Sequence, residues 1–543
     1  MTDSTDVLAN APDVWGGGQL LAFSGIDGAT DFQAGLVART PFYGTGLEVK
    51  LPARCRLEFS SRPPVSTRLS GDALRLVTPE GTVRGAFLDA YHILLEGPCR
   101  VAEKDAGIAS LSREGRTLVG TASRFRPELL RADLDGAQRD RTAWLSARSI
   151  PAGLGASRRR TYGKALSQLK TMVYGPEGAI RRRYTTPDRW PHQGMWLWDS
   201  AFHAVGLRRL DAALAREILE ALFDGQQADG RVPLRIDPDG VDQRFTQPPL
   251  IALAAMEIQE ADPDPEWLRR IFPALEAYLR WDLAHRDGDG DGFLEWAVTD
   301  EVTCRSGESG MDNSPRFDGG ARIAAVDFNS FMAHECELME RMAALLRLPD
   351  RAREWGDLYR RRAAAVGERF WDPRLGFYFD WDPAGRRLLP VRACSGFYPL
   401  LCGAADAEQA ALLAEKLADP RWFATPLPVP TISADDATHY AKDMWRGPVW
   451  MNVNWLVARG LERYGFRREA DGIRRASVEE VERHYLRYGT LFEFFDDRRE
   501  VDPPALLRKG ECNPGKSPYR QVFHDYGWTA SLYVDMVHAL AGR

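Results

Sequence analysis

The residue pattern changes near position 150, and this change limits the possible folds more than any other feature. Before it, apolar and β-branched residues come in short runs separated by Gly, Pro, Asp and Ser, and no helical periodicity appears before about Leu129. Such runs predict strands, and several at this spacing predict a β-sandwich. The clearest are Arg56–Ser60, Ala73–Thr78, Ala90–Glu96 and Thr117–Ser123.

After the linker-like stretch Pro151–Ser157, apolar residues recur at helical spacing. The predicted helices are Leu207–Gly225, Pro265–His285, Phe328–Arg347, Asp350–Trp371, 405–418, 449–464, 467–488 and 527–541. So many helices joined by long loops favour a helical toroid over a four-helix bundle. A chain of 543 residues exceeds one ordinary domain. We expect a β-sandwich domain at 1–150, a linker at 151–160 and a helical domain at 161–543.

Composition and charge exclude several classes of protein. The net charge is −6, with 71 Lys and Arg against 77 Asp and Glu, which argues against a nucleic-acid partner. No apolar run reaches the length of a membrane span, and the N-terminus lacks the features of a secretory signal. Seven cysteines without a CxxC pair predict reduced thiols. We therefore expect a cytoplasmic protein without a membrane or nucleic-acid partner; the sequence specifies no oligomeric state.

Tryptophan is concentrated in the helical part, where 14 of the 16 lie after residue 155. Core packing explains some of them. In loops that also carry Asp, Asn, Gln and Arg, tryptophan rings are typical of sites that cover the apolar face of a sugar. One such loop is Thr185–Gly206, where Asp199 can serve either as a helix N-cap or as a bidentate acceptor for two sugar hydroxyls.

An acidic loop follows the predicted helix Pro265–His285. Asp287, Asp289 and Asp291 alternate with glycine, as in loops that gather oxygen ligands around Ca²⁺. The loop is not a full EF-hand, since Glu295 comes too early for the bidentate position. A tight acidic turn without a metal is the alternative.

Carboxylates in aromatic or non-periodic surroundings are the candidates for chemistry. Asp312 lies in Gly-Met-Asp-Asn-Ser-Pro, where no packing pattern requires an acid, and Glu493 lies among phenylalanines. Glu511 is a further carboxylate in a loop nearby. Glycosidic cleavage needs two carboxylates, one to protonate the leaving oxygen and one to activate water or attack carbon.

One competing motif is Gly510–Ser517, which fits the phosphate-binding pattern GxxxxGK[ST]. A working loop of this type follows a buried strand and opens a helix. Prolines on both sides argue against that context, so the sequence favours a chance match.

Six motifs, in order from about Tyr162 to Leu540, resemble those of glycoside hydrolase family 63. They are HQGMWLWDSAFHA, TQPPL, GMDNSPRFD, WRGPVWMNVNW, FEFF and YGWTASLY. The sequence is most similar to the bacterial α-glucosidases and the glucosylglycerate and mannosylglycerate hydrolases of the family. The resemblance implies a mainly α fold, an (α/α)6-barrel catalytic domain preceded by a β-sandwich. It also implies inverting, exo-acting hydrolysis of short α-glucosides or α-mannosides, with a small carbohydrate as substrate.

The resemblance also assigns roles to residues of this sequence. Asp312 resembles the general acid and Glu493 the general base. Asp199 resembles a ligand of the sugar in the −1 subsite. The other substrate-binding residues implied are Trp196, Trp198, Gln247, Trp445, Arg446 and Trp450. No cofactor is implied for the chemistry, and the loop with Asp287, Asp289 and Asp291 resembles a structural Ca²⁺ site of some bacterial members.

The sequence departs from the family pattern after the base. Asp496 is followed by Asp497, and the segment Arg498–Gln521 precedes the closing Gly-Trp pair. Glu511 lies nearer to that pair and is followed by Asn-Pro, so it remains an alternative base or a substrate contact. The extra segment can shape or cover the pocket.

Three other functions remain open. A trehalase-like inverting α-glucosidase shares the barrel and a similar Trp-Asp motif. A helical-toroid enzyme of another class, such as an epimerase or polysaccharide lyase, is the second; an epimerase would need histidine pairs in the cavity, and the chain has only nine histidines. A non-catalytic carbohydrate-binding protein would lack one of the two carboxylates. A glycerate-containing substrate would also require a clamp for its own carboxylate. Arg316, Arg446 and Arg520 are available for it.

Overall fold

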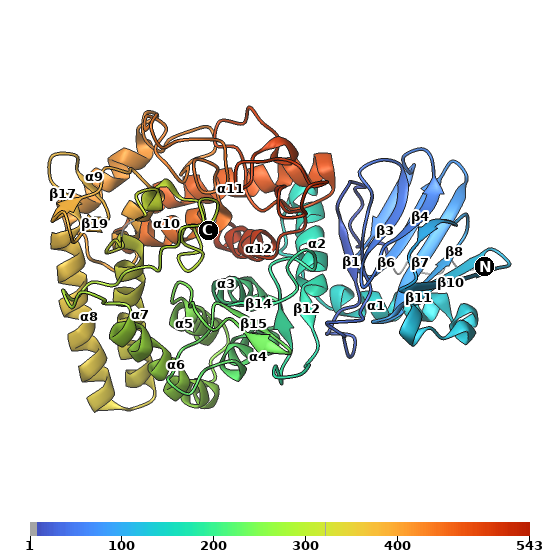
Figure 1. The fold of residues 1–543 in the computed structure, drawn as a ribbon, viewed down its shortest axis with the longest axis horizontal. Helices are drawn as coiled ribbons and strands as arrows, with labels where there is room; N and C mark the ends of the chain where they lie inside the picture. Colours follow the sequence, from blue (N-terminus) through green and yellow to red (C-terminus); the bar gives the residue numbers. More distant parts are fainter. Residues whose placement is uncertain (1–7, 321, 543) are drawn as a thin grey trace.

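The computed structural model describes residues 8–320 and 322–542, so residues 1–7 of the predicted first domain lie outside the description. Strands dominate the N-terminal part and helices dominate the remainder, and the two parts lie side by side (Figure 1). The chain as a whole is therefore mixed in secondary structure, with its helices concentrated in the part where periodicity predicts them.

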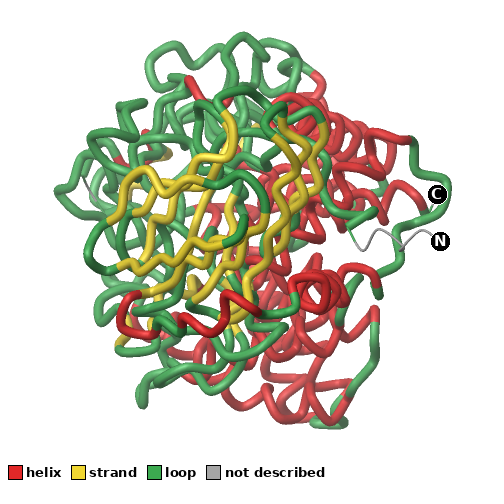
Figure 2. Tube along the Cα trace, turned by 90° about the vertical axis from the view of Figure 1, so that its right-hand side faces the viewer, coloured by secondary structure: helices red, strands yellow, loops and turns green. Residues whose placement is uncertain are grey.

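Two antiparallel sheets form the N-terminal part (Figure 2). The first has the order β1 (Leu20–Ala22), β2 (Val37–Arg39), β3 (Thr45–Leu51), β4 (Cys55–Ser60), β9 (Arg100–Lys104). The second has the order β10 (Ile108–Arg113), β11 (Arg116–Thr121), β8 (His92–Glu96), β7 (Gly81–Asp89), β6 (Ala73–Thr78), β5 (Ser66–Leu69). All four strands named in the sequence analysis are present.

The alternation of side chains explains why these sheets stack. In β6, Leu74 and Leu76 are buried while Arg75 and Val77 are exposed. Apolar side chains from both sheets join one hydrophobic cluster, to which β4 contributes Leu57 and Phe59. Each sheet thus buries its apolar face against the other.

Helices follow in the second part of the chain. After α1 (Leu134–Ser146) and α2 (Ala156–Thr171) come α3 (Leu197–Leu207), α4 (Ala212–Asp224), α5 (Ile251–Ala261), α6 (Pro265–His285), α7 (Val326–Leu345), α8 (Pro349–Arg369), α9 (Ala407–Ala418), α10 (Met451–Arg463), α11 (Arg467–Tyr488) and α12 (Gly527–Ala541). A 3₁₀ helix, η4 (Cys394–Leu400), lies between α8 and α9. Helix α2 begins inside the predicted linker 151–160.

Short strands lie in the loops between these helices. They pair as β12 (Val173–Tyr174) with β13 (Tyr184–Thr185), β14 (Met195–Trp196) with β15 (Arg235–Asp237) and β16 (Gly240–Val241), β17 (Trp371–Asp372) with β18 (Phe377–Tyr378), and β19 (Trp381–Asp382) with β20 (Arg387–Leu388). β14 is the most relevant of them, because it leads directly into α3.

Every second helical element packs against the next in a closed series. Helix α3 contacts α5, α5 contacts α7, α7 contacts η4, η4 contacts α10, α10 contacts α12, and α12 contacts α3. The intervening helices pack outside, as α8 does against α7 and α11 against α10. The loops that precede the inner helices therefore have a common centre.

Periodicity correctly predicts helices α4 and α6 to α12 but misses α1, α2, α3 and α5. Every residue of α3 is buried, and α5 is buried from Ile251 to Gln259. A helix buried on all sides has no polar stripe, so its sequence lacks the contrast between an apolar and a polar face that marks a surface helix. The prediction misses α2 for a different reason. Its buried face includes the polar residues Lys164, Gln168 and Lys170, so no apolar stripe is visible in the sequence.

Asp525 connects the two parts of the molecule. Its carboxylate accepts hydrogen bonds from Leu20 N of β1 and Thr490 Oγ1, each at 2.8 Å, and it pairs with Lys164 Nζ of α2 at 2.8 Å. Asp525 and Lys164 are both buried. No helix among the described residues is long and apolar enough to cross a membrane.

We expect Asp525→Asn to lower the free energy of unfolding by about 3–5 kcal/mol, since it leaves the buried Lys164 ammonium without its carboxylate. Urea unfolding monitored by circular dichroism measures the change. Asp350→Asn is the control: it neutralises a highly exposed partner of Arg353 and should cost no more than about 1 kcal/mol. Equal losses of unfolding free energy in the two variants would show that the buried Lys164–Asp525 pair stabilises the protein no more than an exposed ion pair does.

Candidate active site

One cavity collects most of the residues singled out in the sequence. Asp312 and Glu493 both line it. The other lining residues are Pro187, His192, Trp196, Trp198, Asp199, Gln247, Gly310, Met444, Trp445, Trp450, Arg508, Tyr526 and Trp528. Most of them lie at, or in the loop just before, the first turn of an inner helix. The closed series of helices therefore brings together motifs that are far apart in the sequence.

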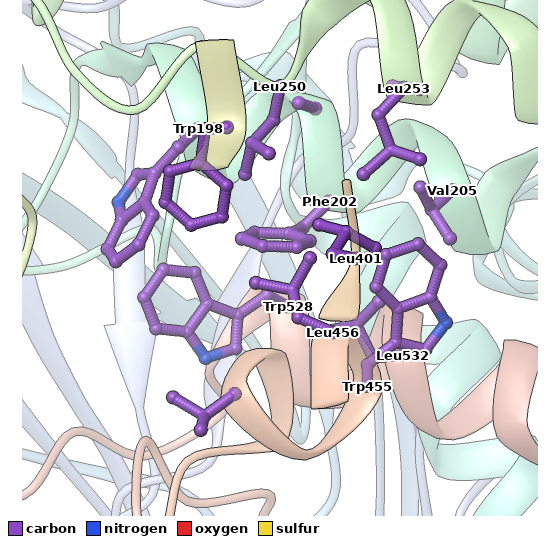
Figure 3. Close-up of a cluster of buried hydrophobic side chains, with 14 of the residues drawn as sticks. Trp198, Phe202, Val205, Leu250, Leu253, Leu401, Trp455, Leu456, Trp528 and Leu532 are labelled. Carbon is purple, nitrogen blue, oxygen red and sulfur yellow. The ribbon is translucent and has the colours of Figure 1, made fainter. Parts of the chain in front are cut away.

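Tryptophan rings form one side of the cavity. Trp445 and Trp450 stack with centroids 3.8 Å apart, and Trp198 lies edge-on to Trp528 at 5.1 Å. Figure 3 shows Trp198 and Trp528 beside Phe202, in a layer of apolar side chains that continues into the helical core. The rings thus serve both predicted purposes: they belong to the core, and they present an aromatic surface to the cavity.

The loop that carries Asp312 is fixed from both sides. Downstream, Arg316 is fully buried and pairs with Asp327 at 2.5 Å and with Asp380 at 2.7 Å. Asn313 Oδ1 accepts a hydrogen bond from Trp445 N at 3.0 Å. Upstream, Glu308 is buried and accepts hydrogen bonds from Thr246 N and Ala297 N, as well as from a guanidinium group. Asp312 is thereby held at the cavity by contacts from several elements.

Gly310 is required by this geometry. Its φ is +73°, and a Cβ atom placed on it would lie 2.2 Å from Trp198 Cζ2. The backbone therefore passes directly against the indole, two residues before Asp312.

The carboxylate of Asp312 is partly exposed and pairs with Lys509 Nζ at 2.8 Å. Burial lowers the pKa of Lys509, but the neighbouring Asp312 carboxylate outweighs it and the pKa lies above its usual value. The thiol of Cys304 also lies against Asp312, and burial together with this carboxylate raises its pKa to about 12. Lys509 is therefore a cation and Cys304 a neutral thiol at neutral pH.

Glu493 is buried, and its position is set by two chain segments. Its amide N donates to Phe523 O at 3.0 Å, and Phe523 N donates to Glu493 Oε2 at 3.2 Å. Arg508 Nε lies 3.0 Å from Glu493 Oε2. Burial raises the pKa of Glu493, and the Arg508 guanidinium opposes this increase without cancelling it.

Asp199 lies in the first turn of α3, whose N-cap is Trp196, so the N-cap interpretation of Asp199 is wrong. The helix begins earlier than the sequence suggests because β14 leads straight into it. Burial raises the pKa of Asp199 well above its usual value, although a hydrogen bond from Tyr526 Oη at 3.3 Å opposes the increase. Gln247 Oε1 accepts from Trp198 N at 3.2 Å, which joins the second motif to the first.

The structure places several predicted residues outside the cavity. Arg446 pairs with Asp318 at 2.7 Å and donates to Asn313 O. Glu511 is partly exposed and pairs with Lys516 at 2.5 Å. Two further arginines were considered for binding a substrate carboxylate. Arg316 instead forms buried ion pairs within the protein, and Arg520 donates a hydrogen bond to Lys509 O.

Sequence reasoning missed Arg508, Lys509, His192 and Tyr526. The two cations lie in the segment 498–521, which the family pattern does not cover, and no periodicity marks them. His192 and Tyr526 stand inside quoted motifs, so their position beside other site residues was an available signal. His192 is oriented by Asp188, whose carboxylate accepts from its backbone N at 2.9 Å.

The acidic loop lies away from this cavity. Carboxylate oxygens of Asp287, Asp289 and Asp291 all lie within 4.8 Å of one another. Each carboxylate also accepts one backbone hydrogen bond within the loop. Asp287 Oδ1 and the neighbouring Glu295 Oε1 are buried and have no hydrogen-bond partner among the described residues. The competing motif Gly510–Ser517 does not open a helix, since residues 518–526 are non-helical and α12 begins only at Gly527, so it lacks the structure that phosphate binding requires.

Comparison with known proteins agrees with this arrangement. Residues 191–529 match the family described as mannosylglycerate hydrolase MGH1-like glycoside hydrolase domain. The mannosylglycerate hydrolase of Thermus thermophilus is 29% identical over 403 residues, covering 58% of this chain and 92% of that protein. The glucosylglycerate hydrolase of Mycolicibacterium hassiacum is 26% identical over 399 residues, covering 55% and 87%.

A similar fold is found among solved structures. The crystal structure of a family 63 mannosylglycerate hydrolase from Thermus thermophilus, in complex with Tris and D-glycerate, matches with a TM-score of 0.57 and 25% identity. The match covers 69% of this chain and 99% of that one. All four matches therefore leave a part of this chain uncovered.

We expect Gly310→Ala to destabilise the protein by more than the roughly 1–2 kcal/mol that a left-handed conformation costs an L-residue, because the new methyl group also collides with Trp198. Urea unfolding, followed by tryptophan fluorescence, measures it. Gly319→Ala, whose Cβ would meet nothing within 4 Å, is the control and should stay near the wild-type value. A neutral Gly310→Ala would mean that the loop can move away without cost.

Proposed function

Because the chain belongs to the family of mannosylglycerate hydrolase MGH1-like glycoside hydrolase domains, we propose that it hydrolyses short α-glycosides, with glycosylglycerates as the first candidates. The observation that carries this proposal is the presence of Asp312 and Glu493 in one tryptophan-walled cavity. The names of the relatives support the substrate class. The proposed reaction is exo-acting and proceeds with inversion at the anomeric carbon.

The proposed architecture is an N-terminal β-sandwich domain at 1–150, a linker at 151–160 and an (α/α)6-barrel domain at 161–543. The closed series of contacts through α3, α5, α7, η4, α10 and α12 supports the barrel. The separate hydrophobic cluster between the two sheets supports an independent first domain.

In the proposed mechanism, Asp312 protonates the glycosidic oxygen while Glu493 removes a proton from water on the opposite face of the sugar. The raised pKa of Glu493 makes it a stronger base once it is ionised, and Arg508 fixes its orientation. An inverting pair leaves room for the attacking water between the two carboxyl groups.

Sugar recognition in this proposal uses the cavity walls. Asp199 binds sugar hydroxyl groups, and Tyr526 orients its carboxylate. The indole N–H groups of Trp445 and Trp528 are buried and find no acceptor in the part of the chain that the structure describes, so each can donate to a hydroxyl group. A neutral carboxyl at Asp199 would donate as well as accept, which suits a ring hydroxyl that does both.

The loop with Asp287, Asp289 and Asp291 is a proposed structural Ca²⁺ site. Three clustered carboxylates and the unpartnered buried oxygens of Asp287 and Glu295 fit a hard cation that prefers oxygen ligands. The loop lies outside the cavity, so the ion would stabilise the fold and take no part in the reaction.

Proton NMR of the first minutes of reaction tests the function and its stereochemistry together. Glucosylglycerate, mannosylglycerate, kojibiose, nigerose, maltose and trehalose form the substrate panel. We expect the β-anomer of the released sugar to appear first from a glycosylglycerate. Preferred cleavage of trehalose would identify the trehalase-like alternative, and an α-anomer first would contradict inversion.

We expect Asp312→Asn and Glu493→Gln each to lower kcat by about 10²–10⁴-fold, because each removes one proton-transfer group. Asp312→Asn should change the unfolding temperature little, whereas Glu493→Gln should also destabilise the protein by about 3–5 kcal/mol, because it leaves the buried Arg508 guanidinium without its carboxylate. Initial rates on the best substrate of the panel measure the loss. Glu511→Gln is the matched control, since Glu511 lies outside the cavity, and it should keep near wild-type activity. If Glu511→Gln lost activity and Glu493→Gln kept it, the base would be Glu511.

For the acidic loop, we expect Ca²⁺ added to chelator-treated protein to raise the unfolding temperature. At a concentration of 100 Kd the stabilisation is about 2.7 kcal/mol. Differential scanning calorimetry with and without Ca²⁺ measures it, and Asp287→Asn should abolish the response whereas Asp300→Asn should preserve it. An unchanged unfolding temperature in the wild type would mean that the loop is only an acidic turn.

A further inference from the structure

Two consecutive cations of the segment 498–521 reach the two proposed catalytic carboxylates. Arg508 pairs with Glu493 at 3.0 Å, and Lys509 pairs with Asp312 at 2.8 Å. Neither cation was expected from the sequence, and together they bring two positive charges to a site built around negative groups. Their two environments differ, and this difference suggests different roles.

The three guanidinium nitrogens of Arg508 all bind acceptors of the protein. Nε and Nη2 face the Glu493 carboxylate, Nη1 donates to Tyr519 O at 2.9 Å, and the guanidinium lies 3.9 Å from the centre of the Phe523 ring. The side chain is only 5% exposed. Arg508 therefore holds the base in place and has little freedom to bind anything else.

Lys509 is less constrained at its charged end. Its side chain is 18% exposed and that of Asp312 is 21% exposed, so their ion pair lies where solvent reaches it. Among the described residues, Asp312 is the carboxylate within ion-pair distance of Lys509. An ammonium group has three donors, so Lys509 can bind a second anion or exchange one for another.

The backbone of Lys509, in contrast, is held firmly. Its φ is +58°, an uncommon value for a residue with a side chain. Arg508 N donates to Glu511 O at 2.8 Å, and Gly510 N donates to Asp443 Oδ2 at 2.9 Å. These bonds fix the chain on both sides of Lys509 and direct its side chain toward the acid.

The Lys509–Asp312 pair creates a conflict with the proposed chemistry. A general acid must carry a proton, whereas a neighbouring ammonium group favours the ionised carboxylate. The charged and titratable groups that the structure places against Asp312 are Lys509 and Arg508 from one loop and the neutral Cys304 thiol from another. Lys509 Nζ lies 2.8 Å from Asp312 Oδ2, so this ion pair has to open before the carboxyl group can meet the glycosidic oxygen.

An anionic leaving group would supply that change. In a glycoside of the 2-hydroxyl of glycerate, the carboxylate and the glycosidic oxygen are attached to the same carbon atom. When Asp312 lies beside the glycosidic oxygen, that carboxylate is one carbon atom away from the same oxygen, and one rotation about the bond to this carbon brings it toward the cation that touches Asp312. The substrate anion then competes for Lys509 with the acid itself.

We propose that Lys509 recognises the carboxylate of an anionic leaving group, and that this exchange of partners releases Asp312 to act as the acid. The inference rests on the proposed function and deepens it, since it names the residue that recognises the leaving group and couples this recognition to the acid. Lys509 is a positioning and specificity-determining residue in this scheme.

Protons balance over one turnover. On binding of the anion, Lys509 remains charged and pairs with the substrate carboxylate, while Asp312 takes one proton from solvent. The bond between the anomeric carbon and the glycosidic oxygen breaks, Asp312 gives its proton to that oxygen, and water adds to carbon as Glu493 takes a water proton. Glu493 then returns its proton to solvent, so one glycoside and one water yield one sugar and one glycerate.

Binding of D-glycerate by isothermal titration calorimetry tests recognition without any turnover. We expect Lys509→Met to weaken Kd at least tenfold, Lys509→Arg to restore most of the affinity, and Lys516→Met to match the wild type. Lys516 is the matched control, because it belongs to the same loop but pairs with Glu511 outside the cavity. Equal affinities in wild type and Lys509→Met would overturn the proposal.

Kinetics on glucosylglycerate and glucosylglycerol, which carries a hydroxymethyl group in place of the carboxylate, test the release of the acid. For the wild type we expect a higher kcat on the anion and a descending pH limb at higher pH than on the neutral substrate. In Lys509→Met the preference in kcat for the anion should be lost, and the descending limb on the neutral substrate should move to higher pH, because no Lys509 ammonium group then faces the acid. A loss confined to KM, with pH profiles unchanged, would overturn the exchange of partners.

The two proposals fail in different ways. Wild-type protein that cleaves no α-glycoside would contradict the proposed function, and D-glycerate binding would still decide the role of Lys509. Wild-type protein that cleaves both substrates equally, with Lys509→Met behaving alike, would leave the glycosidase standing and remove Lys509 from specificity.

Discussion

The position of the proposed acid depends on one buried guanidinium. Arg316 has no exposed side-chain surface and binds two carboxylates, Asp327 in the first turn of α7 and Asp380 beside β19. A buried charge of this kind persists only when it is fully paired, so the three residues position one another strictly. The loop that ends in Arg316 begins with Glu308, and between these two anchors the chain has little choice of path. Asp312 is presented to the cavity as a result.

A second constraint is the balance of charge around the cavity. Asp199 and Glu493 are both buried, and burial raises the pKa of each. Carboxylates that are close together in a poorly solvated space require cations or protons, and the structure supplies Arg508 to Glu493 and Lys509 to Asp312. Asp199 faces the hydroxyl donor Tyr526, and burial raises its pKa well above its usual value. The three acids thus have different electrostatic settings, which is the condition for giving them different roles.

Much of the fold could be predicted because surface elements carry a stripe. Helix α6 shows the pattern clearly: it buries Leu268, Leu275 and Leu279 on one side, and both of its ends match the sequence expectation. Helices α3 and α5 could not be found in this way, because they are buried on all sides and the contrast between faces is lost. The same burial hides the beginning of α3 and led to the wrong N-cap interpretation of Asp199. The helices next to the cavity, α3 and α5, were therefore the hardest to predict from the sequence.

The sequence by itself determined the kinds of chemical group and their order: tryptophan-rich motifs, two acids in non-periodic segments and an acidic glycine loop. Only the tertiary structure decided which members of each kind meet. Glu493 and Glu511 are similar candidates in the sequence, but hydrogen bonds to Phe523 hold the first in the cavity while the second pairs with Lys516 outside it. Arg508 and Lys509 enter the site because Asp443, far away in the sequence, binds the loop next to them. Such contacts depend on the path of the whole chain, and no local pattern of residues encodes them.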